Sequence, residues 1–177
     1  MEQQDDFVIP FRGLGTGIHR FHYAIDGSFF EELEYSEIQE GNLTVDLTMD
    51  RQERMLLLDF LIQGTVDVPC DRCLEDFSLE VDDHPRLIVK FGDAYEEEDD
   101  DIIVIPHEEH QIDVRQHIYE YILLSLPLRR VHPDDELGQS TCDPDMLSAL
   151  ERLQVHPPAD GRWDALSGLR DEAEEEE

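Results

Sequence analysis

Leu-Thr-Val-Asp-Leu-Thr-Met-Asp, residues 43–50, is the stretch that decides the fold of this chain. Apolar and polar side chains alternate there, and a period of two residues indicates a β-strand with one buried and one solvated face. The following residues 55–68 are apolar at most positions. They predict a central strand buried on both faces, with Gly64 marking a bulge.

The same patterns extend the sheet on either side of this pair. Residues 17–25 predict an earlier strand, residues 28–33 a short helix, and residues 77–81 a strand that follows the central one. We therefore expect an antiparallel sheet from about residue 15 to residue 105, for which closure into a barrel is an open alternative.

An acidic block interrupts the end of this sheet. Residues 87–91 and 102–105 are short apolar runs with β propensity, and residues 93–101 between them are acidic except for Ala94 and Tyr95. The two runs predict a hairpin whose tip is a solvated acidic loop.

Helical signals replace the strand pattern in the last third. Asp113 and Gln116 have the spacing of a capping box, which predicts a helix over residues 114–126 that packs on the sheet. Asp143 before Pro144 predicts the start of a second helix, and Asp160 can cap a short last one. The fold class is therefore α+β.

Charge sets the domain organisation and excludes several partners. Asp and Glu outnumber Lys and Arg by 45 to 13 over 177 residues, so the net charge is −32. Such a chain repels phosphate backbones and anionic membranes, which disfavours direct RNA binding. We expect one domain over residues 1–170 and a disordered acidic tail over 171–177, in a cytoplasmic protein.

The feature that carries chemistry is Cys70-Asp71-Arg72-Cys73. Two thiols separated by two residues can bind one tetrahedral zinc ion from a tight turn, and Cys142 and His132 are the candidates for the third and fourth ligands. The simpler interpretation, which the sequence favours, is a pair of partly buried thiols in a β-turn. A dithiol oxidoreductase is disfavoured, because the pair lies between strands rather than at a helix N-terminus. No nucleophile with a partnered base is apparent, so we expect no enzymatic activity.

Two motifs carry a resemblance to a known family. Residues 68–75, Val-Pro-Cys-Asp-Arg-Cys-Leu-Glu, resemble the signature of the YceD family of large ribosomal RNA subunit accumulation proteins. Residues 160–169 are similar to that family's terminal motif, with Gly161 where proline is commoner. The resemblance points to Arg72, Leu74, Asp160, Arg162 and Trp163 as motif or partner-binding residues.

The resemblance implies a cytoplasmic, non-enzymatic factor that supports 23S rRNA accumulation and large-subunit assembly. Genes of this family often lie beside that of a small, basic ribosomal protein, and an acidic chain suits such a partner, or a particle that contains it. Many members carry further cysteines that would complete a metal site, whereas this sequence keeps only Cys142 there. The alternative is a metal- or thiol-dependent protein that uses Cys70 and Cys73.

Overall fold

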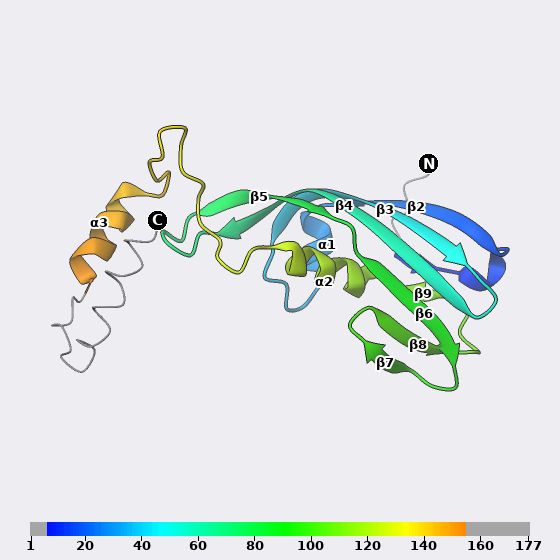
Figure 1. Cartoon of the computed structure of the whole chain (residues 1–177). Coiled ribbons are helices and arrows are strands. Elements are labelled where there is room, and N and C mark those ends of the chain that lie inside the picture. The colour runs from blue at the N-terminus through cyan, green and yellow to red at the C-terminus, as the bar shows by residue number, and fades with distance from the viewer. Residues whose placement is uncertain (1–6, 155–177) are drawn as a thin grey trace, which may run out of the picture. The chain divides into compact units, whose positions relative to one another are not determined.

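The alternating stretch lies in one of the two longest strands of an α+β fold. In the computed structural model, which describes residues 7–154, β3 (Glu40–Arg51) pairs antiparallel with β4 (Met55–Pro69) in a continuous register (Figure 1). The alternate apolar side chains of β3 are buried, as the two-residue period predicts: Leu43, Val45, Leu47 and Met49.

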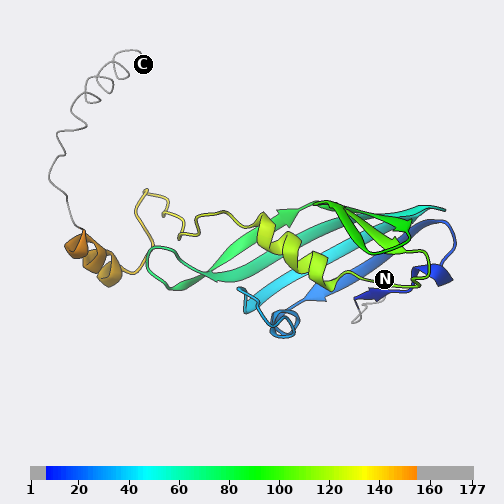
Figure 2. The same ribbon diagram turned by 90° about the horizontal axis from the view of Figure 1, so that it is seen from below.

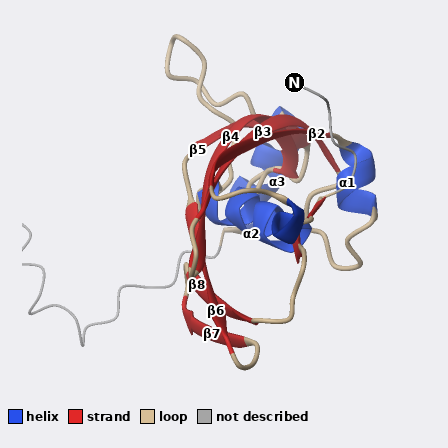
Figure 3. Ribbon diagram, turned by 90° about the vertical axis from the view of Figure 1, so that its right-hand side faces the viewer, coloured by secondary structure: helices blue, strands red, loops and turns tan. Residues whose placement is uncertain are grey.

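Seven strands form the main sheet, which curves around the helix α2 (Arg115–Ser125) (Figure 3). The strand order is β2 (Gly17–Ile25), β3, β4, β6 (Arg86–Gly92), β8 (Ile102–Pro106) and β7 (Glu96–Asp99). A further strand, β5 (Asp76–Asp83), pairs with β4 beyond the residues that pair with β6. The sheet is open, so the alternative of a closed barrel is wrong.

The acidic block does not form the tip of a hairpin between β6 and β8. These two strands run parallel, because the chain first passes through β7 and then returns as β8 between β6 and β7. The apolar β8 thereby gains pairing on both sides, and the acidic β7 takes the sheet edge, where charged side chains stay solvated. Part of the predicted loop 93–101 is therefore a strand.

Burial along β4 also differs from the prediction. Leu56, Leu58 and Phe60 are buried, whereas Leu57 and Leu61 between and beyond them are only half-buried. The strand therefore has one core face and one partly covered face. Its apolar sequence reflects both packing on the core and partial cover of the second face.

Gly64 allows a close approach of two strands and marks no bulge. Pairing of β4 with β3 is regular through Gly64, which lies opposite Leu43. Gly64 has a φ of +147°, and a Cβ atom there would lie 2.2 Å from the carbonyl oxygen of Asn42. Glycine tolerates both conditions because it has no Cβ.

The helix α2 lies across one face of the sheet (Figure 2) and closes the core. Ile118, Tyr121 and Ile122 are buried, and the rings of Tyr121 and Phe60 lie 5.4 Å apart. The helix forms where it was predicted, but the capping box does not form. Asp113 Oδ1 accepts a hydrogen bond from the Arg115 N–H at 2.9 Å.

Two short segments complete the core beside α2. The predicted short helix is α1 (Gly27–Glu31), which buries Phe29 and Phe30. Near the N-terminus, β1 (Val8–Ile9) pairs antiparallel with β9 (Ile112–Asp113), just before α2, and the 3-10 helix η1 (Phe11–Gly13) follows β1.

The chain divides into two compact units, residues 1–141 and 142–177. In the second unit α3 (Pro144–Leu153) begins where it was predicted, and the Asp143 side chain accepts a hydrogen bond from the Asp145 N–H. Asp160, its expected short helix and the acidic tail lie outside the described residues. The division into one domain and a tail stays a prediction. No helix in residues 7–154 is long and apolar enough to cross a membrane.

Candidate metal centre

The turn between β4 and β5 holds the first two candidate ligands. The Cys70 N–H donates to the Glu75 carbonyl at 2.9 Å, and the Leu74 N–H donates to the Cys70 carbonyl at 2.9 Å. These hydrogen bonds close a tight turn and bring Cys70 and Cys73 together. Leu74 takes a left-handed φ of 66°, rare for leucine, and its side chain is 72% exposed.

A segment far along the chain returns to this turn after α2. The Asp71 N–H donates to the Arg130 carbonyl at 2.7 Å, and the Arg130 N–H donates to Asp71 Oδ2 at 2.6 Å. The His132 ring lies 4.6 Å from the Phe77 ring of β5, measured between centroids. The reciprocal pair and the ring contact fix His132 beside the two cysteines.

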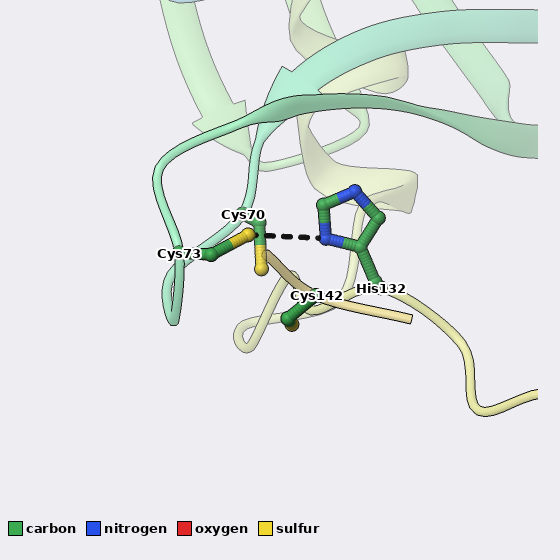
Figure 4. Close-up of side chains that lie close together, drawn as sticks. All are labelled: Cys70, Cys73, His132 and Cys142. Carbon is green, nitrogen blue, oxygen red and sulfur yellow. Dashed lines mark hydrogen bonds between the residues drawn. The ribbon is translucent and has the colours of Figure 1, made fainter. Parts of the chain in front are cut away.

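Four side chains from these segments form one cluster (Figure 4). One ligand atom from each of Cys70, Cys73, His132 and Cys142 lies within 4.8 Å of all the others. Cys73 Sγ and His132 Nδ1 are 3.4 Å apart. The three cysteines are buried. Cys142 follows Thr141, whose hydroxyl donates to the Pro133 carbonyl at 2.7 Å.

The surroundings of Cys70 favour a thiolate. Burial raises the pKa of this thiol, but hydrogen bonds from backbone groups of Cys73, Arg72 and His132, together with the His132 side chain, outweigh burial and lower the pKa to about 5. One of these bonds is from the Arg72 N–H to Cys70 Sγ, at 3.4 Å. The turn therefore supplies donors to a sulfur that has little access to water.

Both the donors and their spacing fit a metal ion. Three thiols and one imidazole are a ligand set of tetrahedral sites, in which sulfurs 2.3 Å from a central ion lie about 3.8 Å from one another. The observed upper limit of 4.8 Å requires only a small contraction. Because all four ligands come from the protein, the set resembles a closed structural site rather than one with an open position for substrate.

The other sequence candidates divide into three groups. Arg72 Nη1 donates to the Ser140 hydroxyl at 3.1 Å. Leu74 lies on the same turn without reaching the cluster. Asp160, Arg162 and Trp163 lie outside the described residues.

Sequence reasoning did not identify Asp71 and Arg130 as the contacts that join the turn to the distant segment. Asp71 stands inside the two-cysteine motif, and its partner lies 59 residues further along the chain. Nothing in the local pattern marks such a pairing, because both partners read as ordinary surface residues.

The fold and the cluster together define a class of protein: an α+β domain with a candidate metal centre at the turn between two of its strands. The sequence model of the YceD family, described as large ribosomal RNA subunit accumulation protein, matches residues 58–170. The chain therefore belongs to the YceD family. Searches of curated proteins and of solved structures find no match.

Proposed function

We propose that this protein is a non-enzymatic, cytoplasmic factor that supports 23S rRNA accumulation and assembly of the large ribosomal subunit. The family match over residues 58–170 carries the proposal. The matched region contains the two-cysteine turn, α2 and the segment with His132 and Cys142.

The proposed partner is a basic ribosomal protein, free or in a precursor of the large subunit. A net charge of −32 repels RNA phosphates and attracts cationic proteins over long range. Block 93–101 supports this choice, because its strand β7 places four acidic residues at an edge of the sheet. This charge would steer the partner and shield it until its RNA site is available.

Leu74 is a candidate contact for that partner. Its left-handed backbone conformation costs free energy. Because the side chain is exposed, packing within the chain offsets little of this cost. Contact with another protein would bury this apolar side chain and so stabilise the complex.

For the cysteine cluster we propose a structural zinc ion. It would join the turn at residues 70–73 to His132 and Cys142, and so hold segment 129–142 beside the end of the sheet. The competing function is a metal- or thiol-dependent enzyme on the same residues. The closed four-ligand set favours the structural role, because catalytic zinc keeps a position for water or substrate.

Affinity capture tests the ribosomal proposal. The tagged full chain is isolated from its native cell at low salt, and the proteins and RNA in one eluate are identified. We expect enrichment of large-subunit proteins or 23S precursor over small-subunit material. Protein partners should resist nuclease treatment and be recovered in much smaller amounts at about 0.5 M salt, where the Debye length is short. Equal recovery of both subunits, or of neither, contradicts the proposal.

Metal analysis separates the roles proposed for the cluster. We expect about one zinc ion per purified chain, and loss of zinc in His132→Asn. His84→Asn is the matched control, because His84 is an exposed histidine outside the cluster. A metal-free protein, or equal zinc content in both variants, contradicts the zinc site. Turnover of a dithiol substrate that Cys70→Ser abolishes would support the enzyme instead.

A further inference from the structure

A groove runs between the acidic edge of the sheet and α2, and none of the four cluster residues lines it. It consists of two adjoining hollows of about 580 and 690 Å³. Glu97 on β7, Ile103 on β8 and His117 on α2 line both hollows. We refer to it as the β7–α2 groove.

The floor of the groove is apolar and its rim is acidic. Ile103 and Leu123 are partly buried against the core, and Leu124 beside them is 79% exposed. Six carboxylates line the two hollows: Glu96, Glu97, Asp99, Asp100, Asp113 and Glu120. Among the described residues that line it, none is lysine or arginine.

These two features together specify the chemistry of an occupant. An apolar floor favours an occupant with apolar side chains that leave water on binding. The acidic rim favours cationic side chains one or two residues away from those apolar side chains in the occupant's sequence. A nucleic acid would bring phosphates to the carboxylates and is repelled. A peptide with lysine or arginine flanking leucine-like residues satisfies both floor and rim.

We propose that the β7–α2 groove docks a basic, amphipathic segment of a partner protein. The inference rests on the proposed function, since it assigns the binding surface for the basic partner. Apolar side chains of that segment cover Leu124 and Ile103, while its cations approach Glu97 and Glu120. Binding therefore combines burial of apolar surface, which salt does not weaken, with attraction that salt screens.

Defined peptides test the two contributions with the full chain. The probe is a fluorescein-labelled peptide that alternates lysine and leucine. Peptides of equal length replace leucine by serine or lysine by glutamate. Anisotropy should give saturable binding of the lysine–leucine peptide, about tenfold weaker binding of the lysine–serine peptide, and no binding of the glutamate peptide. Equal affinity for the first two, or no binding of the first, overturns the proposal.

Variants locate the binding site. Glu97→Lys with Glu120→Lys should weaken binding of the lysine–leucine peptide at least about tenfold, because the reversed charges repel lysine next to the floor. Glu34→Lys with Glu80→Lys changes the net charge equally at exposed positions outside the groove, and should weaken binding less than about threefold. An equal loss of affinity in the two double variants would show that the attraction is diffuse, and would overturn the proposed site.

Leu124 and Leu137 provide the matched apolar pair. Both are exposed, and only Leu124 lines the groove. Leu124→Ser should weaken binding of the lysine–leucine peptide about fivefold, and Leu137→Ser should leave its affinity unchanged. Thermal unfolding of each variant confirms that the fold is retained, and equal effects of the two substitutions contradict the apolar contact.

Capture from cells with the groove variants separates this inference from the proposed function. If Glu97→Lys with Glu120→Lys still enriches large-subunit proteins as the unaltered chain does, the groove proposal fails and the ribosomal proposal stands. If peptides locate to the groove and the unaltered chain captures no large-subunit material, the ribosomal proposal fails and the groove remains a peptide site.

Discussion

The β3–β4 pair and the cysteine-cluster end differ in what holds them together. In the pair, residues close in sequence form a continuous ladder, and every second side chain enters one apolar core. At the cluster end, segment 129–142 has little regular structure and meets the sheet through the Asp71–Arg130 backbone contact, the Phe77–His132 rings and four candidate ligands.

This comparison shows two ways of fixing a chain. The sheet distributes its stability over many small burial terms, so we expect it to lose stability only where packing or backbone geometry is directly disturbed. The cluster end concentrates its order in a few contacts between residues about 60 positions apart, so one change can release it while the sheet persists.

The largest effect is expected in the β3–β4 pair. Gly64→Ala should lower the free energy of unfolding by about 3 kcal/mol, because the new Cβ meets the Asn42 carbonyl and the φ of Gly64 is unfavourable for alanine. Denaturant unfolding measures the change. Gly13→Ala is the control, since a Cβ there has nothing within 4 Å, and its effect should stay within about 0.5 kcal/mol. Similar stability of the two variants would contradict the close approach of the strands.

Metal removal probes the other region. With a chelator, amides of residues 70–74 and 130–142 should exchange with deuterium at least about tenfold faster, because the joined segments separate. Amides of β3 and β4 should keep their protection. Uniform loss of protection across both regions would abolish the contrast between them.

A smaller effect is expected at the backbone contact beside the cluster. Asp71→Ala removes the acceptor of the Arg130 N–H, and the Arg130 amide should exchange about fivefold faster, which corresponds to about 1 kcal/mol. Asp71→Asn keeps a side-chain oxygen at this place and serves as the control. If both substitutions speed exchange of the Arg130 amide equally, the charge of Asp71 and not its hydrogen bond protects that amide.

The smallest effect concerns His117 on α2. Burial lowers its pKa from 6.5, against the opposing charges of Glu120, Asp113 and Glu97. The unfolded chain therefore binds this proton more readily, and the stability of the domain falls as the pH drops from about 7 through 6.5 toward the lowered pKa.

Replacing this imidazole should reduce that part of the acid sensitivity. Relative to the unaltered protein, His117→Gln should gain stability as the pH falls from about 7 to about 5, measured by unfolding at several pH values. His84→Gln removes an exposed imidazole, and an equal gain there would assign the effect to net charge.

Single strands and helices are easier to predict from the sequence than the way in which they pair. The alternation at residues 43–50 and the Asp143–Pro144 start signal predicted β3 and α3, because strand burial and helix capping are local. The parallel pairing of β6 with β8 was missed, since local patterns identify strands and leave their order open.

The four residues that lie together were named as candidate ligands, although the sequence favoured a simple pair of thiols in a turn. Cys70 and Cys73 form a local motif, so their proximity follows from the turn. His132 and Cys142 were named as candidates because they lie in the irregular segment. Contacts between residues far apart in sequence bring that segment to the turn: Asp71 with Arg130, Arg72 with Ser140, and Phe77 with His132.

The pairing of β1 with β9 has a consequence for synthesis of the chain. Ile9 and Phe11 are buried, and Phe7 stacks on Tyr23 at 5.0 Å between ring centroids, yet the strand that holds this end in place is residues 112–113. At translation rates of about 5–20 residues per second, those residues follow about 5–20 s after the first strand. The growing chain therefore carries an apolar N-terminal segment without its β partner until most of the sheet has been made.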